Sequence, residues 1–451
     1  MKATRFVSIA MILGAAACGS GQKTQSGLGS GKAPPPPPHV GDAKPDAPDA
    51  PKREISKDAK GDYQAALDFY SAQEKGGWNE SGCKQSADKF SAVAREHKLV
   101  EAQYMVGRSL HNCNLLEDAE KAYQAAIAMK SNHAQSISNL GEIYFRDGKT
   151  SAAKDYWTNA IKANPKLIAA RNNIASLDLE EMRKPDTDAA KWTALEADAR
   201  QNLSNALAVD NDNVKSYVLY GLVYMEGRQK NKNRLDLAKL LLDEGAKRTD
   251  KYAPLENARG LYFLYRNNLS EALNHFSKAV ELDPKFAEAR MNVGLITLGF
   301  RKYDVARDQF QKVLELQPKN YDAIIGLGIA ARGMNDLDAA ETAYKKAKDL
   351  DGSRGDAFYN LGVLYKDFKA AKQADLKASQ EAYRTARGFF QQFGEKKGTD
   401  ADKQEAKDNI ADCDKVIKQL DEFIKNMANQ PPPAPTPPPA PTPAPAAPPA
   451  K

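Results

Sequence analysis

Residue types that could carry catalysis are present in this chain, but their spacing does not indicate an active site. The histidines show neither a metal-ligand spacing nor an HExxH-like context. They are His39, His97, His111, His133 and His275. Gly29-Ser30-Gly31-Lys32 is similar to the end of a phosphate-binding loop, but Ser26 and Ala33 stand where such a loop needs Gly and Ser or Thr. The sequence therefore predicts a non-enzymatic protein with no catalytic residue, metal, cofactor or small-molecule substrate.

The start of the chain has the pattern of a secretory signal. Lys2 and Arg5 precede a short apolar run at residues 6–13, and small residues follow it. A basic start, a short apolar run and small residues are typical of a cleaved signal, here residues 1–17. The run is too short to be a permanent membrane span.

Cys18 is the residue at which this signal favours a covalent modification. The small residues before Cys18 resemble the bacterial lipobox, although Leu13 lies further from the cysteine than that motif prefers. The resemblance implies cleavage before Cys18 and lipidation of its thiol. Gly19, rather than Asp, follows the cysteine, which by the same resemblance implies an outer-membrane anchor, with the protein facing the periplasm. An ordinary secretory signal with a coincidental cysteine is the alternative.

A pattern with a period of 34 residues fills most of the chain. Asn139-Leu140-Gly141 is followed by Ala153, Trp157 and Pro165, and the same offsets recur further along the sequence. The small residues that mark each unit are Gly107, Gly141, Ala175, Gly221, Gly260, Gly294, Gly328 and Gly362. The pattern resembles the tetratricopeptide repeat (TPR), a helix–turn–helix unit. It predicts an all-α superhelical solenoid of eight to nine repeats over residues 62–398, including a weaker unit at 62–99.

An amphipathic helix is expected after the last repeat, over residues 399–428. Ile410, Cys413 and Ile417 recur at intervals of three or four, with charged residues on the opposite face. We interpret it as a cap over the last repeat, and a membrane-surface or partner helix is the alternative. Three units are lengthened by polar insertions, which predict loops or helix extensions: 183–186, 228–233 and 369–377.

The two ends of the chain differ in composition from the repeats. Eight of the 25 prolines lie between residues 34 and 51, and twelve lie between 431 and 449. Residues 18–61 are also rich in Gly, Ser and Lys, which predicts a disordered tether. Residues 429–451 are predicted to form a disordered tail that populates polyproline II.

Cys83 and Cys113 are candidates for a disulfide. An exported protein meets an oxidising compartment, and both cysteines fall near the helix–helix turns of two units that should stack side by side. A disulfide and two free thiols both remain open from the sequence. Cys413 is expected to be a small buried residue of the cap helix.

A ligand groove is expected on the first helices, which line the concave face of TPR proteins. Asn139, Asn173, Asn292 and Asn360 lie two residues before the small marker residue. An amide there could hold a ligand backbone, or it is simply the usual repeat residue. Apolar residues near the markers suit an extended or helical peptide, or they pack between units. The full predicted groove set is Asn139, Asn173, Leu222, Asn257, Leu261, Asn292, Leu295, Ile329 and Asn360.

The overall layout resembles TPR lipoproteins that scaffold bacterial envelope machines, and most of all those of the adventurous gliding-motility apparatus of myxobacteria. The resemblance rests on Cys18, the Pro-rich ends and the long repeat array, and it implies envelope or motility partners and a lipid contact with the membrane. An accessory lipoprotein for secretin or pilus assembly, or for activating a cell-wall enzyme, is the alternative. The net charge of +6 over 451 residues is modest, and no basic cluster interleaves with aromatics, so nucleic acid is not an expected partner.

Overall fold

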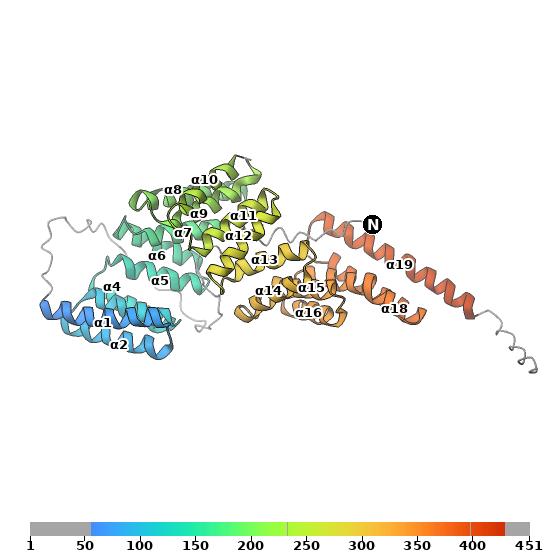
Figure 1. The fold of residues 1–451 in the computed structure, drawn as a ribbon, viewed down its shortest axis with the longest axis horizontal. Helices are drawn as coiled ribbons and strands as arrows, with labels where there is room; N and C mark the ends of the chain where they lie inside the picture. The colour runs from blue at the N-terminus through green and yellow to red at the C-terminus, as the bar shows by residue number, and fades with distance from the viewer. Residues whose placement is uncertain (1–55, 232, 397, 429–451) are drawn as a thin grey trace, which may run out of the picture. The chain divides into compact units, whose positions relative to one another are not determined.

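The computed structural model describes residues 56–231, 233–396 and 398–428. Within these ranges the structure contains nineteen α-helices and no strand. They form nine consecutive pairs and a long final helix (Figure 1). The predicted all-α repeat architecture is confirmed. The described residues divide into two compact units, one of residues 56–296 with 315–318 and one of residues 297–314 with 319–428.

The first unit holds the first six helix pairs. Their helices are α1 (Lys57–Gly76), α2 (Glu80–His97), α3 (Val100–Asn112), α4 (Leu116–Met129), α5 (Ala134–Arg146), α6 (Thr150–Ala163), α7 (Ile168–Met182), α8 (Ala189–Val209), α9 (Val214–Glu226), α10 (Arg234–Ala246), α11 (Ala253–Tyr265) and α12 (Leu269–Leu282). A short 3-10 turn, Gly227–Gln229, follows α9 where one insertion was expected. The first helix starts at Lys57, five residues before the predicted start of the repeats at residue 62.

The seventh pair contains the boundary between the two units, and the remaining helices belong to the second. They are α13 (Ala287–Gly299), α14 (Tyr303–Leu316), α15 (Tyr321–Gly333), α16 (Leu337–Leu350), α17 (Asp356–Val363), α18 (Leu376–Gly394) and α19 (Asp400–Ala428). A π-helical stretch, Leu364–Lys369, and a 3-10 turn, Ala370–Lys372, extend α17. This extension absorbs part of the third predicted insertion.

Five of the marker glycines lie under a ring of the second helix, and Gly221 lies under the Leu242 side chain; the five are Gly107, Gly141, Gly260, Gly328 and Gly362. A Cβ added to Gly141 would come within 2.6 Å of the Trp157 indole, and one added to Gly260 within 2.5 Å of the Phe276 ring. Real Cβ atoms do not approach other atoms so closely, so only glycine fits without displacing the ring. The second-helix alanines that the repeat predicts are completely buried: Ala119, Ala153, Ala199, Ala238, Ala272, Ala306 and Ala340. The 34-residue pattern thus encodes the packing inside each pair.

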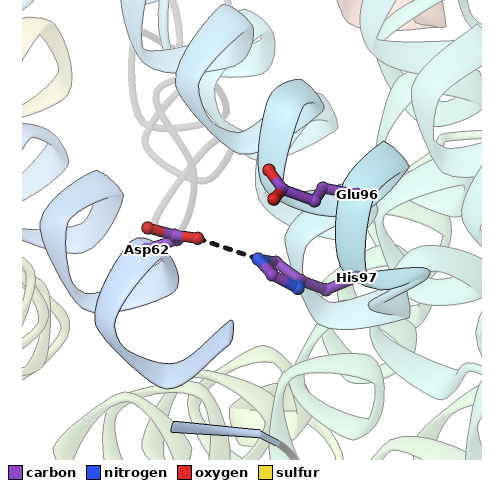
Figure 2. A group of neighbouring side chains, drawn as sticks. All are labelled: Asp62, Glu96 and His97. Carbon is purple, nitrogen blue, oxygen red and sulfur yellow. Dashed lines mark hydrogen bonds and ion pairs between the residues drawn. The ribbon is translucent and has the colours of Figure 1, made fainter. Parts of the chain in front are cut away.

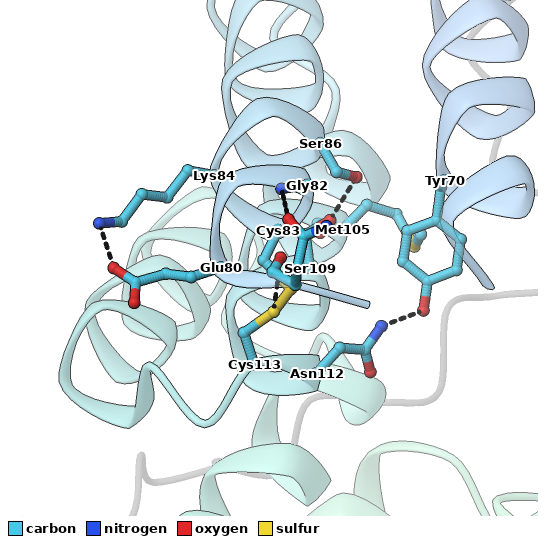
Figure 3. Close-up of a disulfide and its surroundings, with 11 residues drawn as sticks. Tyr70, Glu80, Gly82, Cys83, Lys84, Ser86, Met105, Ser109, Asn112 and Cys113 are labelled. Carbon is cyan, nitrogen blue, oxygen red and sulfur yellow. Dashed lines mark hydrogen bonds and ion pairs between the residues drawn. A yellow bond between two sulfur atoms is a disulfide. The ribbon is translucent and has the colours of Figure 1, made fainter. Parts of the chain in front are cut away.

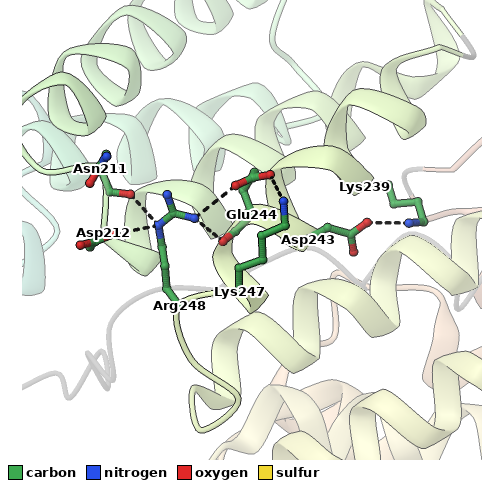
Figure 4. Close-up of polar contacts among 7 residues, drawn as sticks. All are labelled: Asn211, Asp212, Lys239, Asp243, Glu244, Lys247 and Arg248. Atoms are coloured by element: carbon green, nitrogen blue, oxygen red, sulfur yellow. Dashed lines mark hydrogen bonds and ion pairs between the residues drawn. The ribbon is translucent and has the colours of Figure 1, made fainter.

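Contacts also join one pair to the next, and Figure 4 shows a polar example in the first unit. The Arg248 guanidinium, just after α10, donates to the Asn211 carbonyl at 2.6 Å and pairs with the Asp212 carboxylate at 3.2 Å in the turn before α9. The same group donates to Glu244 and lies over the Tyr217 ring, 4.5 Å from its centroid. Because the guanidinium is planar and carries several N–H donors, arginine suits such a junction better than lysine would.

The final helix packs on the last pair, as expected of a cap. Cys413 of α19 is completely buried against the ring of Phe390 and its neighbours. The Gln380 amide donates to the Asp421 carboxylate at 2.7 Å, and the Tyr359 hydroxyl donates to Glu405 at 2.8 Å. This helix covers the apolar face that the last pair would otherwise expose to water.

Candidate partner-binding site

The first-helix face in the middle of the first unit is closed by its own side chains. Leu222 of α9 is 1% exposed and Leu261 of α11 is 3% exposed. Both belong to one apolar cluster that joins neighbouring helices of the unit. The placement of these two leucines in an open groove is therefore wrong. They pack between repeats, which was the alternative.

Two of the predicted ligand-binding asparagines bind each other instead. Asn257 of α11 is 2% exposed and Asn292 of α13 is 5% exposed. The Asn292 side-chain amide donates to the Asn257 carbonyl oxygen at 2.9 Å. Buried amides need partners, and this pair supplies them inside the solenoid. Neither residue offers its amide to a ligand, which corrects the prediction for both.

The remaining asparagines are also used within the repeats or lie at their surface. The Asn139 amide donates to the Tyr123 hydroxyl at 2.9 Å. Asn360, which is buried, donates to the Asp356 carbonyl at 2.9 Å and accepts from Arg332 at 3.3 Å. Asn173 of α7 is half-buried. The fixed partners of Asn139 and Asn360 give these two amides a structural role.

Leu295 and Ile329 keep part of their side chains exposed. Leu295 lies on α13 in the first unit, and Ile329 lies on α15 in the second. Both are half-buried. Of the predicted groove set, these two, Asn139 and Asn173 are not fully buried, and the Asn139 amide already has the Tyr123 hydroxyl as its partner.

The first-helix face is hollowed at the start of the first unit, where the sequence singled out few residues. A cleft of about 450 Å³ lies across α1, α3 and α5, a volume within the usual range for ligand sites. It is lined by Tyr63, Leu67, Tyr70, Ser71 and Glu74 of α1, Glu101, Tyr104, Met105 and Arg108 of α3, and His133 and Gln135 of α5 and its cap. None of these residues belongs to the groove set predicted from the sequence.

The aromatic walls of the cleft are held by contacts beneath them. The Tyr70 hydroxyl accepts from the Asn112 amide at 2.9 Å. The Tyr104 ring lies 5.9 Å from the Tyr123 ring and 5.5 Å from the His133 ring, between centroids. The Arg108 guanidinium lies 5.5 Å from the centroid of the Tyr70 ring, a cation–π distance. The walls are therefore fixed before any ligand arrives, which lowers the entropic cost of binding.

The electrostatics of the cleft come from three charged side chains. Burial lowers the pKa of His133, so its imidazole is neutral near pH 7. Burial also raises the pKa of Tyr104, which keeps its hydroxyl protonated and able to donate. Glu74, Glu101 and Arg108 then leave the lining with one excess negative charge.

A disulfide joins α2 to the end of α3, the central helix of the cleft. Cys83 of α2 and Cys113, just after α3, are bonded, with Cα atoms 6.2 Å apart (Figure 3). Beside this bond, the buried Ser86 and Ser109 hydroxyls lie 2.8 Å apart. We call the Cys83–Cys113 disulfide and the Ser86–Ser109 contact the clamp. Since α3 carries Tyr104 and Arg108, the clamp fixes the helix at the centre of the cleft.

Three further titratable groups come together that the sequence spacing did not reveal. Asp62 of α1 and Glu96 and His97 of α2 place their ligand-type atoms within 4.8 Å of one another (Figure 2). His97 Nε2 lies 2.8 Å from Asp62 Oδ2. Both carboxylates are exposed, and this hydrogen bond accounts for the position of the ring, so we assign no metal to the cluster.

Comparison with known families identifies the repeat. Models of the tetratricopeptide repeat match residues 100–133 and 134–167, and again 257–321 and 294–357. The chain is a TPR solenoid. The matched ranges include Gly107, Gly141, Gly260 and Gly328, each of which packs under a ring of the second helix. TPR solenoids are generally protein-interaction scaffolds rather than catalysts.

The curated relatives match only part of this chain, and the chain spans only a small part of each of them. The human protein O-mannosyl-transferase TMTC1 is 28% identical over 131 residues, which is 28% of this chain and 14% of that protein. The bovine tetratricopeptide repeat protein 5 is 24% identical over 176 residues, 38% of this chain and 39% of that protein. The matched segments therefore cover 14% of human TMTC1 and 10% of mouse TMTC1.

Solved structures with some likeness come from bacteria. The TPR protein TTC0263 of Thermus thermophilus is 22% identical, with a TM-score of 0.38, covering 44% of this chain and 99% of its own. PilF of Pseudomonas aeruginosa is 20% identical, with a TM-score of 0.39, and the match covers 53% of this chain and 97% of PilF.

The predicted signal, Cys18 and both Pro-rich ends lie outside the described residues. Among the helices that the structure describes, none combines the length and apolarity needed to cross a bilayer.

Proposed function

We propose that this TPR protein is a non-enzymatic scaffold that holds a partner protein of a bacterial envelope complex in the cleft of α1, α3 and α5. The observation that carries the proposal is the cleft itself, which is open, tyrosine-lined and already ordered. Tyrosine contributes a large contact area and few rotors, which is why it recurs at binding hot spots. The closed face around Leu222 and Leu261 offers no comparable surface.

The scaffold is proposed to be anchored at the outer membrane through a lipid on Cys18. The basic start, the short apolar run and the small residues before Cys18 support this assignment. A lipid at one end of the chain and a binding cleft near that same end would hold the partner close to the membrane. We infer that the complex is a gliding-motility apparatus, since the Pro-rich ends and the long array resemble its TPR lipoproteins.

Affinity purification from membranes, followed by mass spectrometry, tests the function. The full chain should enrich gliding or other motility proteins. Enrichment of secretin, pilus or wall-synthesis proteins instead would replace the motility assignment by the accessory-lipoprotein alternative. Arg108→Glu should abolish capture, because it reverses the only cationic side chain of the cleft lining. Lys215→Glu on α9, with the same charge change outside the cleft, should retain it.

The anchor is tested separately. Cys18→Ser should move the protein from the membrane to the soluble fraction, because the acceptor thiol is lost. An unchanged membrane fraction would remove the lipid from the proposal while leaving the cleft untouched.

A further inference from the structure

The occupant that fits the cleft is encoded in the same chain. We propose that the cleft of α1, α3 and α5 is a binding site for a proline-rich segment, and that residues 32–38 of this chain, Lys32-Ala33 followed by five prolines, occupy it in cis until a partner displaces them. The inference adds to the proposed function a ligand class and an internal competitor for the same site. It concerns this chain alone, so it can hold or fail whichever envelope partner is found.

The lining has the chemistry that polyproline needs. Polyproline II has no internal hydrogen bonds, and proline lacks an N–H, so such a segment offers rings and free carbonyl acceptors. Aromatic-lined grooves recognise it. Here Tyr63, Tyr70 and Tyr104 supply the rings, and Arg108 and Gln135, both exposed, supply donors for the carbonyls.

The dimensions also agree. Five residues of polyproline II span about 16 Å at 3.1 Å per residue. Packed helices lie about 8–10 Å apart, so the three rows of α1, α3 and α5 extend over about 16–20 Å. A run of five prolines can therefore touch all three helices, whereas an isolated proline cannot.

Charge is compatible with this segment. Glu74 and Glu101 give the lining its excess negative charge, and Lys32 stands two residues before the proline run. The proline tract at 431–449 has a similar flank, because Lys451 stands two residues after Pro449. The choice of the N-terminal run therefore rests on its short connection to α1.

The connection to α1 makes the intramolecular complex feasible. Residues 39–56, a stretch of 18, separate the proline run from Lys57, and such a stretch can span up to about 60 Å. The whole of α1, with 20 residues, is only about 30 Å long. The run can therefore reach any part of the cleft, and a link of this kind gives an effective concentration in the millimolar range. A weak contact suffices to occupy the site.

Peptide titration of the full chain in mild detergent tests the proposal. The probe is a synthetic peptide of residues 31–40, added to the wild-type chain and to a chain carrying Pro34→Ser, Pro35→Ser, Pro36→Ser, Pro37→Ser and Pro38→Ser. Calorimetry should show saturable binding to the serine variant and at least tenfold weaker apparent binding to wild type, whose site is already filled. Equal affinity for both chains would overturn the occupation in cis, and no binding to the serine variant would overturn the site.

Further substitutions in the serine variant locate the contact. Tyr104→Ala and Arg108→Ala should each weaken peptide binding at least tenfold, and the exposed Arg108 provides a variant that leaves the fold intact. Tyr220→Ala, in the stacked Tyr220–Tyr224 pair of α9, should leave binding unchanged. Retained affinity in Arg108→Ala would exclude the cleft. A peptide of residues 431–440 that bound more tightly than the 31–40 peptide would reassign the occupant and contradict the proposal.

Discussion

The beginning and the middle of the first unit use the same two repeat positions in opposite ways. Tyr104 in α3 and Asn257 in α11 lie three residues before their marker glycines. Arg108 and Leu261 lie one residue after the same glycines. Tyr104 and Arg108 line an open cleft. Asn257 and Leu261 are 2% and 3% exposed and join neighbouring repeats.

A position in the TPR pattern therefore does not determine whether its side chain meets a ligand. Small amides and leucines at these positions close the face and stabilise the stacking of repeats. A tyrosine and an arginine at the same positions leave a hollow with polar edges. The binding surface of a solenoid is therefore found from what occupies these positions in successive repeats, rather than from the positions themselves.

The largest expected effect comes from placing a charge at the closed position. Leu261→Glu should destabilise the first unit by about 4 kcal/mol, because the carboxylate would be buried without a partner. The equivalent change at the open position, Arg108→Glu, should alter stability by less than about 0.5 kcal/mol. Urea denaturation followed by far-UV circular dichroism measures both. Similar stability losses in the two variants would erase the distinction between the regions.

Breaking the clamp behind the cleft should have the next largest effect. Cys83→Ser with Cys113→Ser should lower stability by about 2–4 kcal/mol, because the disulfide restricts a 30-residue separation in the unfolded chain. Hydrogen exchange should accelerate in α1 to α4 and remain unchanged in α9 to α12, since repeats contact mainly their neighbours. Equal acceleration in both regions would show that the two faces are not independent.

The middle region also buries charge, and acid should reveal it. Glu256 of α11 is 1% exposed. Burial opposes its ionisation, but hydrogen bonds from His275 at 2.6 Å and Lys278 at 2.9 Å outweigh burial and lower the pKa of Glu256 to about 2. Its stabilisation is therefore complete above about pH 4.5 and is lost as the pH falls towards 2.

Glu256→Gln measures that contribution. The variant should be less stable than wild type by on the order of 2–3 kcal/mol at pH 6, and the gap should narrow between pH 4.5 and 3. Denaturation midpoints of both proteins across this range provide the test. A gap that stays constant with pH would mean that Glu256 is not ionised in the folded protein.

Asp178 of α7 should show the opposite dependence of stability on pH. Burial raises the pKa of Asp178 to about 7 despite its ion pair with Lys154 at 2.6 Å. The folded protein therefore binds this proton more tightly than the unfolded chain, so ionising the carboxyl costs stability as the pH rises from about 4 to 7.

Asp178→Asn should remove that cost. Lys154 keeps a partner in Asp198 at 2.8 Å. The free energy of unfolding of the variant should therefore rise relative to that of wild type by roughly 1 kcal/mol per pH unit in this range. Denaturation at pH 5 and pH 7 measures the change. A variant whose stability falls relative to wild type as the pH rises would contradict this prediction.

The helix pairs could be predicted because their causes are local and periodic. Gly141 and Trp157 belong to one repeat, and a fixed offset in sequence becomes a fixed contact in the fold. The cap helix followed from the spacing of Ile410, Cys413 and Ile417 for the same reason. These features need no knowledge of how distant parts of the chain meet.

The cleft could not be predicted in this way because its walls depend on contacts between repeats. Tyr70 and Arg108 come from different helices, and nothing in their spacing of 38 residues distinguishes them from Leu222 and Leu261. Glu256 shows the same limit, since its partners His275 and Lys278 lie on another helix. Composition gave no signal either, because later first helices are also rich in tyrosine: α9 carries Tyr217, Tyr220 and Tyr224.

Photo-crosslinking in cells can show whether binding takes place in the cleft or on the closed face. A photoreactive residue would replace exposed Gln135 at the cleft or, in a matched chain, half-buried Tyr220 on α9. We expect position 135 to crosslink to residues 32–38 of the same chain or to an envelope protein, and position 220 to crosslink to neither. Capture of a partner from position 220, with none from position 135, would contradict this expectation.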